Sequence, residues 1–218
     1  MMLTLSGHKA RALDHTSSGH PVALVPSRPQ GTPLQRFGAT LRQYRQQRGL
    51  YQQALAARTG IRHRYLSQIE QGRRNIAVLS LLRLAQALEI PAAWLLAQVD
   101  PHATLAPPVT SDPLPVRDPR KAGVAHDDTP SLQPRDPETL LRLLGTTIRQ
   151  SRQYQGLTQK GLAAKTGLDN SYIGEVERGE RNVSVLNVVR IADALGLSVS
   201  HLLAPLDILQ TPSPPFPE

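Results

Sequence analysis

Residues 41–97 carry the sequence LRQYRQQRGLYQQALAARTGIRHRYLSQIEQGRRNIAVLSLLRLAQALEIPAAWLLA, and residues 148–204 carry IRQSRQYQGLTQKGLAAKTGLDNSYIGEVERGERNVSVLNVVRIADALGLSVSHLLA. The two stretches align without a gap at an offset of 107 residues, with about 26 of 57 positions identical. Most other positions exchange one aliphatic side chain for another, which preserves the buried face. The chain therefore contains one fold twice.

Each copy is predicted to form five short helices. In the first copy, apolar residues from Leu34 to Tyr44 recur at spacings of three and four, and Gly49, Gly60 and Gly72 follow the ends of predicted helices. The second copy has glycines and apolar residues at matching positions. No segment of the chain shows the alternation of apolar and polar residues that is typical of a strand. We therefore predict an all-α fold.

The regions outside the copies lack a periodic apolar face. Residues 99–137 hold nine prolines among alternating charges, which is typical of a linker. The predicted organisation is a disordered tail (1–33), a first domain (34–98), a Pro-rich linker (99–137), a second domain (138–205) and a second disordered tail (206–218). Because such a linker transmits few contacts, the two domains are expected to unfold separately.

The amino-acid composition limits the classes of partner that the chain can be expected to bind. The chain has 25 Lys and Arg against 17 Asp and Glu, which favours a polyanionic partner, and it contains no Cys. No apolar run approaches the roughly 18 residues of a membrane span. Aromatic residues make up only 4% of the chain, so few rings are available to stack on single-stranded bases. These features favour a cytoplasmic protein that binds double-stranded DNA, with no membrane contact.

The second and third predicted helices of each copy carry the functional motif. Only three or four residues around Gly60 or Gly167 separate them, which is the spacing of a helix-turn-helix. The motifs GLxQxxLAxxTGI, YLSQIEQGRRN and LLRLAQALEI resemble the Cro/C1-type (XRE) helix-turn-helix family of phage and bacterial repressors. The resemblance implies two lambda-repressor-like DNA-binding domains in a bacterial, nucleoid-associated transcriptional regulator, more often a repressor in this family.

The resemblance also assigns roles to individual residues. It implies structural Arg–Glu pairs that tie the first helix to the third, and a glutamine at the start of the second helix that reaches a phosphate. The pairs are Arg45 with Glu70 and Arg152 with Glu177, and the glutamines are Gln52 and Gln159.

The DNA-contacting residues of the third helix and the following loop are implied in the same way. In the first copy they are Arg62, His63, Arg64 and Gln68 for bases, with Arg73 and Arg74 for phosphates; the second copy carries Asn170, Ser171, Glu175 and Arg181. Arginine side chains suit guanine and glutamine side chains suit adenine in the major groove.

The second copy differs in charge where DNA contacts are expected. Asp169 and Glu180 stand where the first copy has Arg62 and Arg73. Residues 34–98 carry a net charge of +8 and residues 138–205 a net charge of +2. Since phosphate neutralisation supplies most non-specific affinity, the first copy is expected to bind DNA better.

Two interpretations remain open from the sequence. In one, both copies contact half-sites of an operator. In the other, the chain is a DNA-tethered interaction module, antitoxin-like or anti-activator, whose second copy docks a protein partner or another copy of the chain as a homodimer. Seven histidines without metal-ligand spacing, and the absence of catalytic or nucleotide-binding motifs, predict no enzyme activity, no cofactor and no metal.

Overall fold

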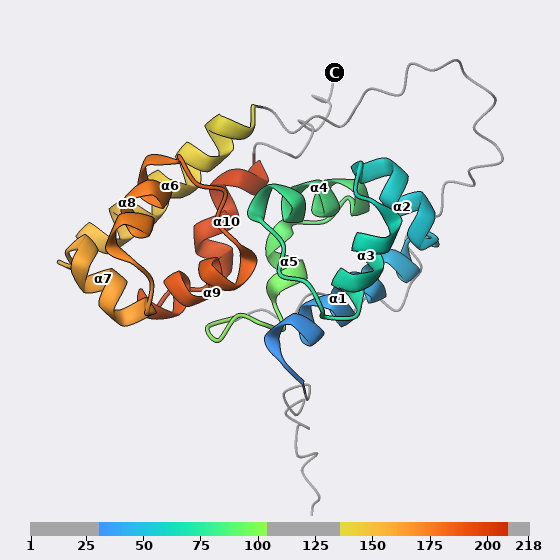
Figure 1. Cartoon of the computed structure of the whole chain (residues 1–218), viewed down its shortest axis with the longest axis horizontal. Coiled ribbons are helices and arrows are strands. Elements are labelled where there is room, and N and C mark those ends of the chain that lie inside the picture. Colours follow the sequence, from blue (N-terminus) through green and yellow to red (C-terminus); the bar gives the residue numbers. More distant parts are fainter. Residues whose placement is uncertain (1–30, 104–135, 209–218) are drawn as a thin grey trace, which may run out of the picture.

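The computed structural model describes residues 31–103 and 136–208, so the tails and residues 104–135 of the predicted linker lie outside the described residues. The first copy forms α1 (Pro33–Gln47), α2 (Gln52–Thr59), α3 (His63–Glu70), α4 (Val78–Leu88) and α5 (Ala92–Leu96). The second forms α6 (Pro137–Tyr154), α7 (Gln159–Thr166), α8 (Asn170–Arg178), α9 (Val185–Ala194) and α10 (Val199–Ile208). In the described ranges every regular element is a helix, which confirms the all-α class and the two five-helix copies (Figure 1).

Local chemistry explains where the first helix of each copy begins. Thr32 forms a capping box with Gln35 ahead of α1, and Pro33 occupies the first turn. The Asp136 carboxylate accepts hydrogen bonds from the backbone N–H groups of Glu138 and Thr139 at the start of α6. Pro137 follows Asp136 at the first helical position, where its missing N–H costs no hydrogen bond.

Close packing of α1 on α3 depends on a glycine in each copy. A Cβ atom on Gly38 would lie 2.5 Å from the carbonyl oxygen of Ile69 and 2.7 Å from that of Glu70. Gly145 meets the carbonyls at the end of α8 in the same way. Only a residue without a side chain allows these backbones to approach so closely.

One continuous core fills both copies. Its members include Phe37 and Leu41 of α1, Leu66 of α3 and the equivalent aliphatic side chains of the second copy, all buried. In the first copy, Trp94 is half-buried and stacks on Tyr44, with ring centroids 6.4 Å apart. This contact ties α5 to α1.

The two copies pair along the segments that precede α4 and α9. The Val78 N–H donates to the Val183 carbonyl at 2.9 Å, and the Val185 N–H donates to the Ile76 carbonyl at 2.8 Å. These bonds surround an isolated antiparallel bridge between Ala77 and Ser184. The donors and acceptors are related by the 107-residue offset of the repeat. The copies are therefore related by a pseudo-twofold axis, as in an isologous dimer.

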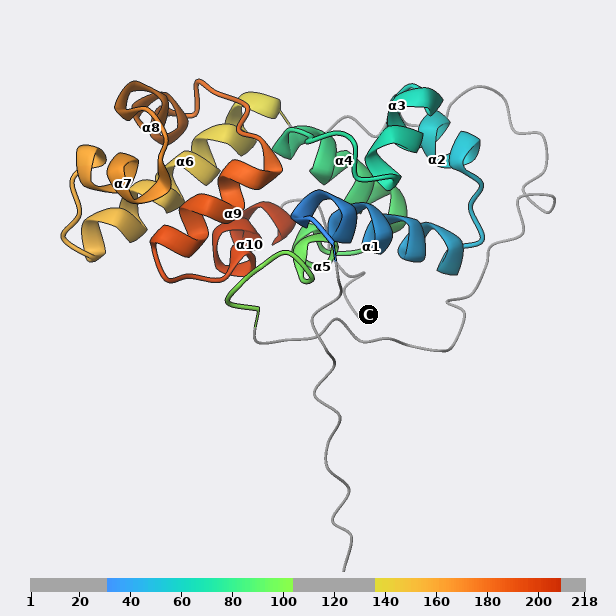
Figure 2. The same ribbon diagram turned by 60° about the horizontal axis from the view of Figure 1, so that its bottom comes forward.

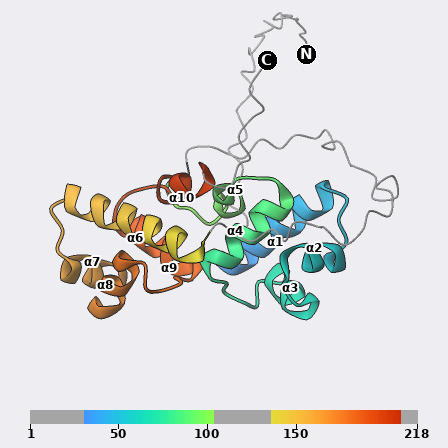
Figure 3. The same ribbon diagram turned by 90° about the horizontal axis from the view of Figure 1, so that it is seen from above.

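Side chains follow the same reciprocal pattern. Asn75 Oδ1 accepts from the Leu186 N–H, and Asn182 Oδ1 accepts from the Leu79 N–H, both at 3.3 Å. At the other end of the interface, α5 and α10 lie side by side (Figures 1 and 3). The equivalent of a homodimer interface thus forms within a single chain.

This pairing corrects three expectations from the sequence. Val99 is buried and Asp100 bonds to the second copy, so residues 99–103 belong to the folded structure and not to the linker. Leu206 is also buried and α10 continues to Ile208, so the C-terminal tail begins later than predicted. Val99 and Leu206 continue the three- and four-residue spacing of the buried residues before them, so the sequence carried this signal and the predicted boundaries stopped too early. The hydrogen-bond partner of Asp100 in the second copy, by contrast, is distant in sequence. The shared core also replaces the expectation of separate unfolding with that of a single transition, a prediction whose test is given in the Discussion.

Candidate nucleic-acid interface

A buried ion pair positions the third helix in each copy. Arg45 donates from Nε to Glu70 Oε1 at 2.6 Å and from Nη2 to Oε2 at 2.9 Å, while its Nη1 donates to the Leu50 carbonyl. Arg152 and Glu177 form the same bidentate pair, and the hydrogen bonds that Arg152 donates to Glu177 raise the pKa of Arg152. The structure thus brings together both residue pairs that the sequence named.

The glutamine at the start of the second helix joins this pair. Gln52 Nε2 donates to Glu70 Oε2 at 2.7 Å, and Gln159 Nε2 donates to Glu177 Oε2 at 2.9 Å. Sequence reasoning assigned both amides to phosphates. Here each amide nitrogen is engaged by a carboxylate, so each glutamine also links the second helix to the third.

The N-terminus of the second helix differs between the copies. Thr158 Oγ1 accepts from the Gly161 N–H at 3.0 Å, whereas Tyr51 provides no side-chain cap for α2. The first-turn N–H groups of α2 therefore have no side-chain acceptor, and an anion could bind there.

The exposed end of α3 is strongly basic. Arg62, His63 and Arg64 are exposed, as is Arg73 in the loop that follows. Within the described ranges, none of the three arginines forms an ion pair. Arg62 and Arg64 also line a shallow hollow with Gly60, Tyr65, Gln68 and Arg74. These uncompensated cations are available to an anionic partner.

The matching end of α8 carries balanced charge. Asp169 caps the helix by accepting from the Ser171 N–H at 2.7 Å, and the Ser171 hydroxyl lowers the pKa of Asp169. Glu175 pairs with Arg181, and Glu180 pairs with Arg178. Asn170 and Ser171 are exposed. The second copy was predicted to carry a smaller positive charge. In addition, its arginines near α8 are already paired to carboxylates.

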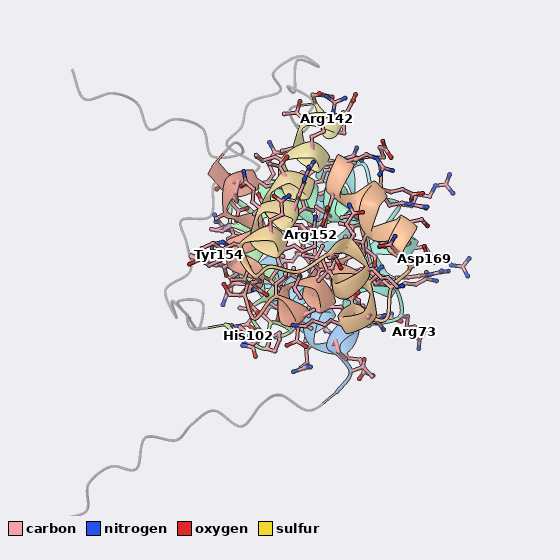
Figure 4. All side chains as sticks on the ribbon, turned by 90° about the vertical axis from the view of Figure 1, so that its left-hand side faces the viewer. Arg73, His102, Arg142, Arg152, Tyr154 and Asp169 are labelled. Atoms are coloured by element: carbon pink, nitrogen blue, oxygen red, sulfur yellow. The ribbon has the colours of Figure 1, made fainter. Side chains whose placement is uncertain are left out.

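The two helix-turn-helix units lie on one side of the molecule. Figures 2 and 3 show α2 and α3 at one end and α7 and α8 at the other, away from α5 and α10. In Figure 4, Arg73 of the first copy and Asp169 of the second project on the same side, opposite His102 and Tyr154. A single extended partner could therefore contact both units.

Sequence reasoning missed some residues that build this arrangement. Two such pairs have members 107 residues apart, which is the offset of the repeat. They are the interface aspartates Asp100 and Asp207 and the packing glycines Gly38 and Gly145. Extending the repeat alignment beyond residues 41–97 would have found all four. In the described part of the chain, no group of three or more His, Asp or Glu side chains could hold a metal, and no helix has the length and hydropathy needed to cross a bilayer.

Comparison with known proteins identifies the family. The helix-turn-helix family profile matches residues 41–95 and again residues 148–202, together about half of the chain. The chain belongs to the helix-turn-helix family. The resemblance to Cro/C1-type (XRE) regulators is thereby confirmed, and both family matches contain one complete helix-turn-helix.

Individual relatives align with about one copy. An uncharacterized HTH-type transcriptional regulator, y4dJ of Sinorhizobium fredii, is 37% identical over 66 residues, covering 30% of this chain and 86% of the relative. The control protein C.SmaI of Serratia marcescens is 43% identical over 61 residues, which cover 28% of this chain and 73% of the control protein. The crystal structure of the restriction-modification controller protein C.AhdI from Aeromonas hydrophila is 45% identical, covers 28% of this chain and 94% of its own, and has a TM-score of 0.28.

Proposed function

We propose that this chain is a sequence-specific double-stranded DNA-binding transcriptional regulator that acts as a repressor. The single observation that carries this proposal is the placement of α3 and α8 on one side of a pseudo-twofold unit (Figure 3), with Arg62 and Arg64 exposed at the start of α3 and outside the ion pairs of the described residues. A third helix of this kind enters the major groove in helix-turn-helix proteins. One chain would then occupy two half-sites, the short DNA segments that each helix-turn-helix contacts.

The residues divide into two groups by their role on DNA. Arg62, His63, Arg64 and Gln68 of the first copy, and Asn170, Ser171 and Glu175 of the second, would contact base edges. Arg73, Arg74, Arg181 and the N-termini of α2 and α7 with Gln52 and Gln159 would contact phosphates. The base contacts set sequence preference, whereas the phosphate contacts set register and salt dependence.

The other interpretation of the second copy has less support. A protein-docking role was suggested by the acidic residues of α8, but these carboxylates neutralise neighbouring arginines and one caps the helix. The face that could pair with another copy as a homodimer is covered within the chain by the pairing of Ile76 and Val78 with Val183 and Val185. We therefore propose that one chain suffices for binding.

Binding of the intact chain to labelled duplex DNA over a series of salt concentrations tests the proposal. Affinity should fall steeply as salt rises, because bound phosphates release their counterions. The variant carrying Arg62→Gln and Arg64→Gln should bind more weakly, because it loses two of the side chains assigned to base edges. Arg190→Gln removes the same kind of exposed charge from α9, outside the helix-turn-helix, and serves as the control.

Duplex binding that is absent, or equal in the Arg62/Arg64 variant and the control, would contradict the placement of α3 on DNA. A reporter gene with the selected operator across its promoter then tests the sign of regulation. Expression of the chain should lower transcription, and a rise would show that the repressor assignment is wrong.

A further inference from the structure

Gln68 and Glu175 occupy the same position in the two copies, and an arginine six residues later holds each of them. Arg74 Nε donates to Gln68 Oε1 at 3.0 Å. Arg181 Nε donates to Glu175 Oε2 at 2.7 Å, and its Nη2 lies 2.6 Å from the same oxygen. The arginine thus engages an oxygen in both copies and leaves the other end of the side chain available.

The available ends of the two side chains differ in the hydrogen bonds that they can form. Gln68 keeps its Nε2 group, which has two N–H donors, and a second lone pair on Oε1. Glu175 keeps Oε1, which as part of an ionised carboxylate can only accept. Both side chains are partly exposed, with 33% of the Glu175 side chain accessible. The two copies therefore present different chemistry to the same point on a bound duplex.

Contacts around Glu175 allow its carboxylate to lie close to DNA. The guanidinium of Arg181 compensates its charge, and the same group lies 5.5 Å from the centre of the Tyr172 ring. The ring and the carboxylate together fix the position of the arginine. Repulsion between the carboxylate and the phosphates is thereby reduced, and the free oxygen keeps a defined direction.

We infer that this chain recognises a non-palindromic operator, in which Glu175 selects a cytosine in one half-site where Gln68 selects an adenine in the other. This inference rests on the proposed function. In the major groove, cytosine presents the N4 amino donor that suits a carboxylate, whereas adenine presents the N6 donor and N7 acceptor that suit a carboxamide. A homodimer would impose the same base at both positions, but a single chain with two different helices does not.

Two neighbouring positions also have different DNA-contacting side chains in the two copies. Arg64 can grip guanine through two N–H groups, and its counterpart Ser171 cannot. Arg62 is replaced by Asp169, whose carboxylate is used to cap α8. The half-site under α3 is therefore expected to contain guanine contacts that the half-site under α8 lacks.

Selection of bound duplexes from a random pool tests this inference with the intact chain. The wild-type chain, Glu175→Gln and Gln68→Glu are compared at one fixed salt concentration. We expect Glu175→Gln to shift one position of one half-site from cytosine to adenine, changing the relative affinity by about 5- to 150-fold. Gln68→Glu should make the opposite change in the other half-site only.

Glu180→Gln is the matched control, because it removes one exposed carboxylate from the loop after α8 without altering the base-contacting position. It should change affinity for all duplexes and leave the preferred bases unchanged. A palindromic operator for the wild-type chain, or an unchanged preference in both swap variants, overturns the inference while the proposed function stands. Failure to enrich any sequence overturns both.

Discussion

Asp100 and Asp207 cap each other's copies: Asp100 Oδ2 accepts from the Val199 N–H at 2.7 Å, and Asp207 Oδ1 accepts from the Ala92 N–H at 2.9 Å. Each carboxylate thus binds the first turn of the last helix in the opposite copy, where the helix dipole favours a negative charge. Two helix caps of this fold therefore lie at the interface between the copies. Capping of α5 and α10 depends on the pairing of the two copies.

Stability should depend on pH through Asp207. Burial raises the pKa of Asp207, although hydrogen bonds from the Ala92 and Ala93 N–H groups act in the opposite direction. The folded chain then binds this proton more tightly than the unfolded chain does. The resulting stabilisation is present below the unfolded pKa of about 4 and is lost as pH rises through the folded pKa. We expect wild type to lose stability relative to Asp207→Asn as pH rises above about 4.

Urea unfolding of both proteins across a pH series measures this difference. The amide oxygen of Asn can still accept the Ala92 N–H bond, so the cap is kept while the titrating group is removed. Asp100→Asn changes the matching cap in the other copy and provides the comparison. A stability difference between wild type and Asp207→Asn that stays constant with pH would contradict the prediction.

The backbone pairing between copies can be tested by removing one N–H group. Val78 is the first residue of α4, a position that tolerates proline, so Val78→Pro removes the bond to the Val183 carbonyl without breaking the helix. We expect a loss of about 0.5 to 1.5 kcal/mol in unfolding free energy. Exchange of the Val185 amide hydrogen, which bonds to Ile76 across the interface, should also accelerate.

Val78→Ala separates packing from hydrogen bonding, because it shortens the same buried side chain and keeps its N–H. Amide exchange followed by NMR should show a larger effect at Val185 in the proline variant. Equal exchange at Val185 in the two variants would mean that this pairing does not hold the copies together.

The buried Arg–Glu pairs should be essential for folding stability. Glu70→Ala or Glu177→Ala leaves a guanidinium buried without its carboxylate and should cost about 3 to 5 kcal/mol. Since the copies share a core, thermal melting should show one transition that moves to lower temperature. Glu89→Ala removes an exposed partner of Arg48 and should cost only about 0 to 1 kcal/mol. Two transitions, of which only one responds, would rule out the shared core.

Base and phosphate contacts should respond differently to truncation. Arg64→Ala should weaken binding to the selected operator by about 1 to 3 kcal/mol and relax the preferred base at one position. Arg73→Ala should weaken binding to all duplexes alike and reduce the salt slope by about one. Fluorescence anisotropy with operator and scrambled duplexes measures both effects. Unchanged operator binding by a folded Arg64→Ala variant would show that α3 does not lie in the major groove.

The sequence predicted what is encoded locally. Helix spacing and the turns at Gly60 and Gly167 depend on short-range patterns that occur in both copies. The pairing of Arg45 with Glu70, 25 residues apart, followed from the resemblance to the family and not from local pattern. The pairing of the copies was missed because its determinants are scattered. Asp100 stands at the edge of a Pro-rich stretch, and its partner Val199 is 99 residues away.

In the candidate site, too, the sequence predicted local features and missed contacts between segments. The order of residues along α3 and α8 predicted which positions are exposed, since three- and four-residue spacing separates buried from exposed faces. It did not predict that Gln52 bonds to Glu70, nor that Arg181 holds Glu175, because these depend on side-chain rotamers between different segments.

Pairing within one chain changes how promoter occupancy depends on the amount of protein. A regulator made of separate subunits must assemble first, so at low concentration its active form increases with the square of the subunit concentration. In this chain the bonds of Val78 and Val185 join the copies without a second molecule. Occupancy should therefore rise in direct proportion to expression, and the regulated gene should respond in a graded manner from the first few molecules made.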